Sequence, residues 1–209
     1  MDERERDLAD QLAAVGREAV DRRLVVASGG NLSARLPGHD AFVVTGAGTW
    51  LDRLRTDDFS LVGLDGAVLD GNPRPSTEWR LHRRTYQVRA DVNAVVHLHP
   101  QTAVVVDALG HAVRMLTLDH ATYLRRIERV PYLPTGSDEL ADAAAEAARG
   151  CDAIILAHHG CSTLGDTVEM AWRRALNLEE AAVNTFRCLQ LGDTTTTFPP
   201  EAMESVRHP

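Results

Sequence analysis

The sequence predicts one domain that mixes helices and strands throughout, of the α/β or α+β class. The chain has 209 residues, which is the size of a single domain. Hydrophobic residues make up 44% and charged residues 25% of the chain, an ordinary balance for a globular protein that argues against disorder. Segments with apolar residues at helical spacing alternate with short apolar runs that are typical of strands.

The first half of the chain is predicted to begin with a long amphipathic helix, because apolar residues recur there at helical spacing with charges opposite them. Two glycines in residues 27–31 end that pattern. Short apolar runs bounded by turn residues then predict strands, and a serine marks the start of a second helix. The predicted elements are a helix over 2–24, strands over 32–35 and 41–45, a hairpin over 61–69 that turns at Asp65-Gly66, and a helix over 76–89 with Ser76 as N-cap.

The second half contains two apolar runs that predict buried strands, each followed by a helical pattern. Pro100 ends the first of these strands, and Ser137 is placed as the N-cap of an Ala-rich helix. The predicted elements are a strand over 94–99, a helix over 101–109, a helix over 137–149, a strand over 153–157, a helix over 166–187, a last strand over 189–191 and an irregular tail over 193–209.

The composition excludes several kinds of enzyme, because all 22 basic residues are arginines and the sequence contains no lysine. A Schiff-base aldolase, a pyridoxal-phosphate enzyme and a P-loop nucleotide hydrolase each need a lysine amine at the reacting centre. None of these three chemistries is therefore available to the chain.

Charge and cysteine usage suggest a cytoplasmic protein. The net charge of −8 argues against a nucleic-acid partner. The N-terminus has no apolar signal core, and no run approaches the roughly 18–20 apolar residues that a membrane span requires. Cys151, Cys161 and Cys188 have spacings that fit neither a zinc knuckle nor a disulfide framework, so we expect reduced core thiols.

The strongest chemical signal is the segment AVVHLHP at 94–100. Side chains alternate faces along a strand, so His97 and His99 are expected to point the same way. Two imidazoles that project together form half of a metal site. The competing interpretation of so short a motif is a pair of satisfied histidines at a strand end.

A second pair, His158 and His159, ends the other apolar strand, and only one of the two can join the first pair. The residues themselves do not say which. A third imidazole would complete a three-histidine site with an open position, which is the catalytic form of a zinc site. The remaining histidines of turns and helical surfaces are interpreted as solvated: His39, His82, His111 and His208.

Three polar segments are candidates for binding an anion. Ser76 and Thr77 open a predicted helix, whose N-terminus offers free N–H groups and a partial positive charge. Glu78 in that first turn is either a general base beside a metal or an ordinary partner of the helix dipole. The Gly-rich loops at 28–31 and 45–48 can wrap an anion through backbone N–H groups, although loops of this composition are commonly plain turns.

Together and in this order, these motifs resemble the class II aldolase/adducin family. The resemblance extends from Val20 to Val183. The segments that carry it are SGGNLSAR (28–35), VVTGAGTWLDRL (43–54), PSTEWRLHRRTYQVRADVNAVVHLHP (75–100) and LAHHG (156–160).

The resemblance implies that residues 1–209 form a single three-layer α/β/α domain with a largely antiparallel central sheet. It implies a homotetramer with active sites between neighbouring subunits. A Zn²⁺ ion, or another divalent transition metal, is expected on His97, His99, His159 and Glu78, with His159 chosen because the family's ligand directly precedes Gly. The residues implied for the substrate phosphate are Ser28, Asn31, Thr45, Gly46, Ser76 and Thr77.

The activity implied is that of a metal-dependent aldehyde-lyase. Such an enzyme cleaves or forms a ketose 1-phosphate from dihydroxyacetone phosphate and an aldehyde, through an enediolate that zinc stabilises, with Glu78 as acid/base. Tyr123 of the adjoining subunit is the candidate on the aldehyde side, with Asp119 and His120 as alternatives, and a tyrosine that merely packs at a subunit contact is the competing interpretation.

The same family contains sugar-phosphate 4-epimerases, dehydratases and decarboxylases, and non-catalytic adducin-like assembly domains. The epimerases usually carry Asp at the position of Glu78, which argues against that activity here. The assembly domains tend to lose the metal histidines, whereas this chain keeps all three. The dehydratases and decarboxylases share the histidines and a glutamate, so the sequence leaves them open.

Overall fold

The computed structural model describes residues 1–207, and in that range eight strands form one sheet of order β4-β3-β2-β1-β5-β8-β7-β6. Neighbouring strands are antiparallel except β6 and β7, which run parallel. In chain order the strands are β1 (Asn31–Ala34), β2 (Ala41–Thr45), β3 (Phe59–Gly63), β4 (Val68–Gly71), β5 (Ala94–Leu98), β6 (Ile127–Val130), β7 (Ala153–Leu156) and β8 (Gly160–Gly165).

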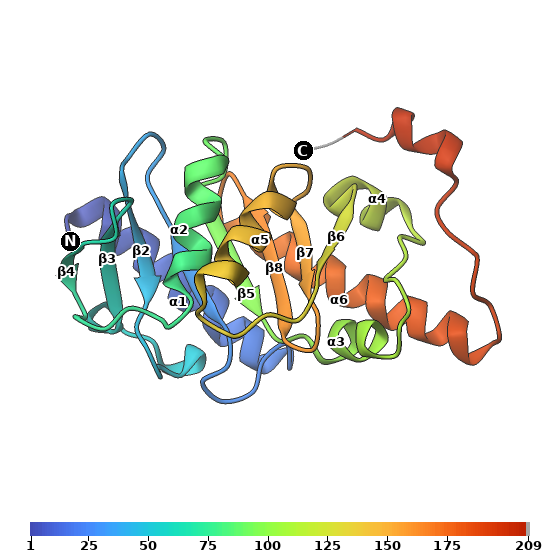
Figure 1. Ribbon diagram of the computed structural model, residues 1–209, viewed down its shortest axis with the longest axis horizontal. Coiled ribbons are helices and arrows are strands. Elements are labelled where there is room, and N and C mark those ends of the chain that lie inside the picture. The colour runs from blue at the N-terminus through green and yellow to red at the C-terminus, as the bar shows by residue number, and fades with distance from the viewer. Residues whose placement is uncertain (208–209) are drawn as a thin grey trace.

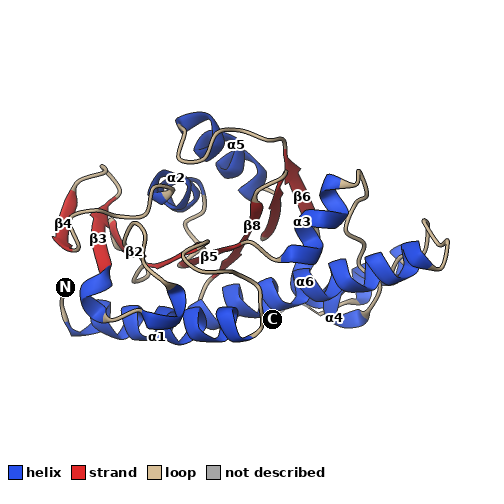
Figure 2. Cartoon of the chain, turned by 90° about the horizontal axis from the view of Figure 1, so that it is seen from below, coloured by secondary structure: helices blue, strands red, loops and turns tan. Residues whose placement is uncertain are grey.

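Helices cover both faces of the sheet, so the molecule has three layers (Figures 1 and 2). Helices α2 and α5 lie together on one face, and α1 and α6 on the other. Helices α3 and α4 pack against α6. The bounds are α1 (Glu3–Asp21), α2 (Trp79–Val88), α3 (Gln101–Ala108), α4 (Leu118–Leu124), α5 (Asp138–Ala148) and α6 (Val168–Gln190), with short 3-10 helices at Leu51–Arg53, Thr56–Asp58 and Pro200–Ser205.

Strand β5 lies in the middle of the sheet and is buried on both faces, which explains its almost continuous apolar sequence. Val96 and Leu98 belong to the core beneath α1 and α6, whereas Val95 belongs to the core beneath α2 and α5. Because side chains alternate along a strand, His97 faces the same side as Val95. The alternation therefore directs the first histidine of the HxH motif toward α2.

Most of the predicted elements are present with their ends moved by one to three residues, and the three-layer fold with its mainly antiparallel sheet is confirmed. Among the α-helices and strands of the described chain, three escaped prediction: α4, β6 and β8. Strand β8 has the sequence GCSTLG, which carries little apolar signal, and it forms because β5 and β7 pair with it on both sides. The predicted strand over 189–191 is wrong, because Leu189 and Gln190 continue the turns of α6 and Leu191 is its C-cap.

The prediction that Ser76 caps α2 is also wrong. The helix begins at Trp79, and Glu78 is its N-cap. Pro75 pairs with Gly46 in an isolated bridge, and the Ser76 N–H donates to the carbonyl of Thr45, so the chain is still extended there. The Ser76 hydroxyl instead accepts from the Glu78 N–H at 3.3 Å. Glu78 consequently stands at the junction of loop and helix, where its side chain can turn toward β5.

The C-terminal segment from 193 to 199 contains no helix or strand and leads into the short 3-10 helix at Pro200–Ser205. His208, interpreted above as solvated, lies outside the described residues. All three cysteines are free; Cys151 and Cys161 are buried and Cys188 is half-buried. In the described part of the chain, no helix has both the length and the apolar composition needed to cross a bilayer.

Candidate metal centre

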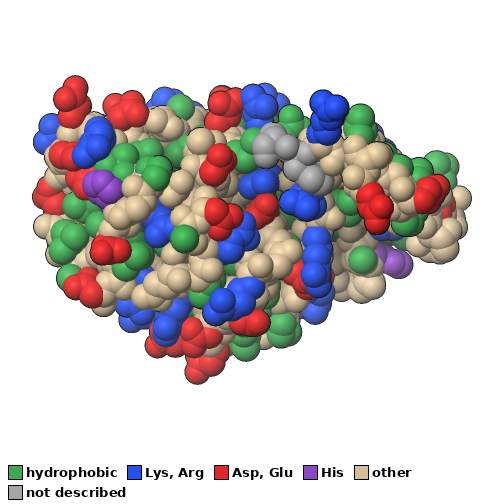
Figure 3. Space-filling view, turned by 90° about the horizontal axis from the view of Figure 1, so that it is seen from above, with side chains coloured by type: hydrophobic (Ala, Val, Ile, Leu, Met, Phe, Trp, Pro, Cys, Tyr) green, Lys and Arg blue, Asp and Glu red, His purple; other side chains and the backbone are tan. Residues whose placement is uncertain are grey.

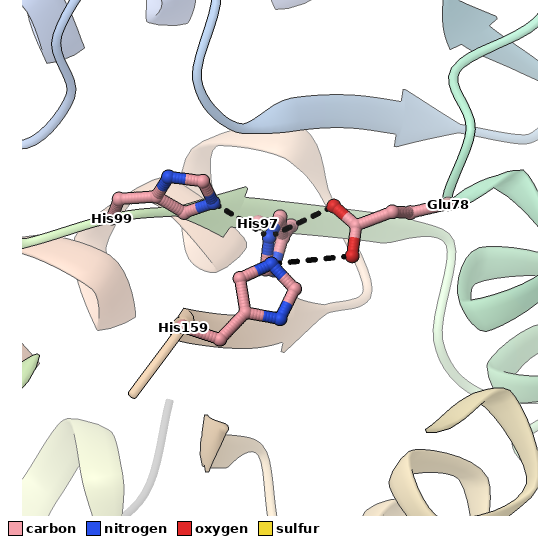
Figure 4. Close-up of side chains that lie close together, drawn as sticks. All are labelled: Glu78, His97, His99 and His159. Atoms are coloured by element: carbon pink, nitrogen blue, oxygen red, sulfur yellow. Dashed lines mark hydrogen bonds and ion pairs between the residues drawn. The ribbon is translucent and has the colours of Figure 1, made fainter. Parts of the chain in front are cut away.

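Four side chains from three separate segments converge at one end of the central strands (Figure 4). Glu78, His97, His99 and His159 each offer one ligand atom, and these atoms lie within 4.8 Å of one another. The Glu78 carboxylate is 3.2 Å from His97 Nε2 through Oε2 and 3.3 Å from His159 Nε2 through Oε1. His97 Nε2 and His99 Nε2 are 3.2 Å apart. The geometry brings together all four residues of the expected ligand set.

Strand ends and one tight turn position the three imidazoles. His97 lies within β5, and His99 follows the end of that strand. His159 lies in the turn between β7 and β8, while its neighbour His158 adopts a positive φ of 56° and is exposed. The turn thus directs the two neighbouring histidines to different surroundings, a distinction that the sequence alone did not make. The next residue must be glycine, since a Cβ at Gly160 would lie 2.6 Å from His99 Cδ2.

The electrostatics of the four residues favour a cation. Glu78 Oε1 is buried, and His159 Nε2 lies 3.3 Å from it. Burial alone would raise the pKa of Glu78, but the neighbouring imidazoles of His97 and His159 outweigh it and hold that pKa well below its usual range. Burial, reinforced by the two other histidines, lowers the pKa of His99 to about 4, so His99 is neutral at pH 7, as a metal ligand must be.

The ligand set also has the outer support that metal sites need. Ser162 faces His97 across the β5–β8 pair, and its Oγ is 3.1 Å from His97 Nδ1. This contact occupies Nδ1 and leaves Nε2 for a metal. Three imidazoles and one carboxylate are borderline donors that suit Zn²⁺ and other divalent transition metals. The residues therefore fit a divalent metal ion.

A pocket of about 240 Å³ opens beside the four candidate ligands. Five of the six residues predicted for a phosphate line it, and they are Ser28, Asn31, Gly46, Ser76 and Thr77. Thr45 does not; its hydroxyl accepts from the Leu32 N–H between β1 and β2. The hydroxyls of Ser28 and Thr77 have no hydrogen-bond partner among residues 1–207. The described lining contains no arginine, so neutral donors surround this pocket.

Sequence reasoning missed two hydroxyl residues of this pocket. Thr49 directly follows the Gly-rich loop at 45–48, and its hydroxyl donates to the carbonyl of Gly46. Thr135 comes from the segment between β6 and α5, far along the chain, and is exposed at the pocket wall. A loop residue of this kind carries no periodic signal, so only the fold could reveal it.

The interpretation of His82 as a solvated surface residue is wrong. His82 is fully buried on the face of α2 that packs against β1. Its Nε2 contacts Asn31 Oδ1 at 2.5 Å, and its Nδ1 contacts Ser33 Oγ at 2.6 Å. Asn31 in turn donates from Nδ2 to Glu78 Oε2 at 2.9 Å. The missed signal is the spacing of Glu78, His82 and Tyr86, which places three polar residues on one stripe of a helix.

The aldehyde-side candidates lie outside this pocket in the single chain. Tyr123 is on α4, which packs against α6, and its carbonyl accepts from Arg174 at 3.1 Å. Asp119 is exposed, and His120 is buried with its Nδ1 accepting from the Leu116 N–H. A role for Tyr123 across a subunit boundary stays a prediction.

Larger pockets also lie away from the candidate metal ligands. One of about 630 Å³ lies between the ends of α4 and α5 and the C-terminal segment, and Arg89, Arg125, Arg126 and Arg149 contribute to its wall. Another of about 340 Å³ borders β6 and the end of α3. Neither contains a described group of metal-ligating side chains. In the space-filling view, acidic and basic side chains are both spread over the exposed face (Figure 3).

Comparison with known proteins agrees with this geometry. The sequence model described as Class II Aldolase and Adducin N-terminal domain matches residues 10–185. An L-fuculose phosphate aldolase of Methanocaldococcus jannaschii is 34% identical over 172 residues, covering 82% of this chain and 92% of that protein. A 5-methylthioribulose-1-phosphate/5-deoxyribulose-1-phosphate aldolase of Rhodospirillum rubrum is 32% identical over 196 residues, covering 93% and 87%.

The fold is likewise similar to that of a solved L-fuculose 1-phosphate aldolase. The two structures superpose with a TM-score of 0.89 at 27% identity, covering 96% of this chain and 94% of the other. The relatives also include a 3-oxo-tetronate 4-phosphate decarboxylase of Haemophilus influenzae, 29% identical over 183 residues, covering 84% of this chain and 86% of that protein. The similar proteins thus share a fold and differ in the reaction that their names describe.

Proposed function

The chain belongs to the class II aldolase and adducin family, and we propose that it is a metal-dependent aldolase acting on a ketose 1-phosphate. In this reaction the enzyme cleaves the sugar phosphate to dihydroxyacetone phosphate and an aldehyde, or joins them. The observation that carries the proposal is the convergence of three histidines and Glu78 beside a pocket of hydroxyl and glycine residues. We infer that Zn²⁺ is the metal, with other divalent transition metals as substitutes.

His97, His99, His159 and Glu78 would hold the metal, which would supply Lewis-acid chemistry to the substrate carbonyl and to the negative charge that develops as the carbon–carbon bond breaks. Glu78 is buried beside the imidazoles of His97 and His159, and its ionised carboxylate can accept a proton from the dihydroxyacetone-phosphate carbon and return it. Its Oε2 accepts from Asn31 and its Oε1 lies 3.3 Å from His159 Nε2, so the carboxylate is held in place for this exchange.

The pocket residues bind and orient the phosphate group. The free hydroxyls of Ser28 and Thr77 come from two separate loops of the pocket lining and can both donate to phosphate oxygens. Gly46 and Ser76 also line the pocket, and the Thr45 hydroxyl accepts from the Leu32 N–H and so links β2 to β1. Orientation of this kind is a large part of catalysis, because it holds the reacting carbon in reach of Glu78.

A second candidate is decarboxylation of a 3-oxo sugar-acid phosphate. The decarboxylase relative from Haemophilus influenzae supports it, because its similarity covers most of this chain. Both reactions place negative charge on the carbon next to a carbonyl, so the same metal and phosphate sites serve either. We further propose a cytoplasmic homotetramer with the active site between subunits, in which Tyr123 acts on the aldehyde of a neighbouring site.

The decisive experiment is a panel of aldehydes incubated with dihydroxyacetone phosphate and the zinc-loaded protein, with product formation measured by chromatography. Ketose phosphate formed with lactaldehyde-like acceptors is the expected result and favours a deoxy-ketose phosphate as substrate. Absence of condensation with every aldehyde, together with release of CO₂ from a 3-oxo-tetronate phosphate, would replace the aldolase proposal with the decarboxylase.

Replacement of Glu78 by Gln tests the proposed proton transfer separately. Glu78→Gln keeps an oxygen ligand at the same position but cannot accept a proton at neutral pH. We expect the variant to retain metal and to lose solvent exchange of the dihydroxyacetone-phosphate C–H proton by about 100-fold or more. The measurement is deuterium incorporation by NMR, and wild-type exchange rates in this variant would dismiss Glu78 as the base.

A further inference from the structure

A continuous row of buried hydrogen bonds leads from Glu78 into the interior between α2 and β1. Glu78 accepts from Asn31 at 2.9 Å, and Asn31 contacts His82 at 2.5 Å. His82 contacts Ser33 at 2.6 Å, and Ser33 contacts Tyr86 at 2.7 Å. Each of these five side chains belongs to a buried residue, and those of Ser33 and His82 are completely covered.

The row exists because two elements present polar stripes to each other. Glu78, His82 and Tyr86 are four residues apart at the start and along one face of α2. Asn31 and Ser33 are two residues apart on one face of β1, where Asn31 pairs with His97 of β5. The two stripes interdigitate in a region that excludes water, so each polar atom depends on its neighbour in the row.

The donor and the acceptor of each hydrogen bond in the row can be assigned in turn, starting at Glu78. An ionised carboxylate can only accept, so Asn31 must turn its NH₂ group toward Glu78. The Asn31 oxygen then faces His82, and it requires a proton on His82 Nε2. A neutral His82 has no second proton, so Nδ1 accepts from Ser33, and Ser33 accepts from Tyr86. Burial, with the charge of His97 adding to it, lowers the pKa of His82 to about 3, so the ring is neutral at pH 7.

We propose that His82 is a positioning residue for the metal centre: as the Nε2–H tautomer it fixes the Asn31 amide so that its NH₂ group donates to Glu78 and aims the carboxylate at the metal. The role rests on the proposed function of Glu78 as metal ligand and base. His82 itself lines no part of the substrate pocket and acts only through Asn31. The opposite tautomer would reverse the amide and set the Asn31 oxygen against the carboxylate, with like partial charges in contact.

Two substitutions at position 82 test whether the site needs a hydrogen-bond donor to Asn31 or only a polar side chain of any kind. His82→Gln places an NH₂ group near the position of Nε2 and can still donate to Asn31. His82→Asn reaches only the position of Nδ1, so it can accept from Ser33 but leaves Asn31 without its donor. The probe is Zn²⁺ alone, titrated into the metal-free full chain in competition with a chromophoric chelator.

We expect His82→Asn to weaken Zn²⁺ binding about 10- to 100-fold, as loss of an outer hydrogen bond to a ligand does, and His82→Gln to bind Zn²⁺ close to wild type. Wild-type affinity in His82→Asn would overturn the proposal. Equal weakening in the two variants, with unfolding midpoints equal to each other, would also overturn it, because rescue by the conservative variant would be missing.

A second test uses the wild-type protein and therefore does not depend on whether either variant folds. The ring ¹⁵N shifts of His82 in the metal-free protein at pH 7 are expected to show a neutral ring with its proton on Nε2. A proton on Nδ1 would overturn the proposal directly. Neither readout involves a sugar phosphate, so a protein that shows the zinc and tautomer pattern but no aldolase activity refutes the proposed reaction while leaving the role of His82 in place.

Discussion

His158 and His159 are neighbours in the chain, yet only His159 faces His97 and His99, with ring centroids 5.0 Å and 5.2 Å away. His158 occupies the left-handed region at the top of the turn and is exposed. These histidines have the same side chain, so only their surroundings distinguish a candidate metal ligand from an exposed turn residue or from the buried His82.

The histidine pair provides a matched test of the ligand assignment. His159→Ala is expected to lose stoichiometric zinc, because three of four ligands remain and an open catalytic site has no spare donor. His158→Asn is expected to keep full zinc occupancy, since Asn tolerates the positive φ at that position. Metal content of the purified proteins by mass spectrometry measures both, and equal zinc in the two variants would exclude His159 as a ligand.

Burial of His82 has a consequence for stability as a function of pH. The pKa of His82 is about 3 in the folded chain and about 6.5 when unfolded, so between these values the unfolded chain binds the extra proton. The free energy of unfolding should thus fall as pH falls from 6.5 toward 3, by at most about 1.4 kcal/mol per pH unit from this residue. His82→Gln should remove that contribution, as measured by urea unfolding of the metal-free proteins at several pH values. Identical pH profiles would show that His82 is not buried as a neutral ring.

At the scale of single elements, β1 carries the polar stripe and must approach β5 closely. Gly30, immediately before β1, has a φ of +74°, and a Cβ there would lie 2.7 Å from the carbonyl oxygen of His97. Glycine is therefore required at position 30 for two reasons: the positive φ of the backbone, and the lack of space for a side chain beside β5, the strand that carries His97.

Gly38 is a suitable control for this position, because it has a similar φ of +76° but no atom within 4 Å of an added Cβ. Gly38→Ala should cost only the strain of a positive φ, about 1–3 kcal/mol, and keep zinc binding. Gly30→Ala should cost more, because β1 must move away from His97, and should weaken zinc binding as well. Unfolding in urea and a Zn²⁺ titration check both effects, and equal behaviour of the two variants would contradict the close-approach argument.

At the scale of the whole molecule, the four candidate metal ligands come from segments that are far apart in the chain. Glu78 comes from the start of α2, His97 and His99 from the end of β5, and His159 from the turn between β7 and β8. A metal on these four residues binds the folded chain and not the unfolded one, so it should stabilise the fold as a unit.

Chelator treatment is accordingly expected to lower the thermal midpoint. With free metal about 1,000-fold above its dissociation constant, binding adds about 4 kcal/mol, which corresponds to about 8–16 °C for a chain of this size. Differential scanning calorimetry before and after chelation, and after zinc is restored, measures the shift. His97→Ala serves as control and should show no response to chelator; a shift of equal size in that variant would place the stabilising metal elsewhere.

Most of the helices and strands, the HxH motif and the Glu78 segment follow from local periodicity and spacing, because alternation along a strand depends only on neighbours in the chain. Local spacing could not choose between His158 and His159, find the polar strand β8, or reveal that His82 is buried, since each depends on partners more than 30 residues away. The start of α2 also depends on a non-local contact, because the bridge between Pro75 and Gly46 delays the helix to Trp79. The sequence by itself thus determined which residues could bind a metal, and tertiary packing decided which ones meet, because burial and long-range pairing set each side chain's final neighbours.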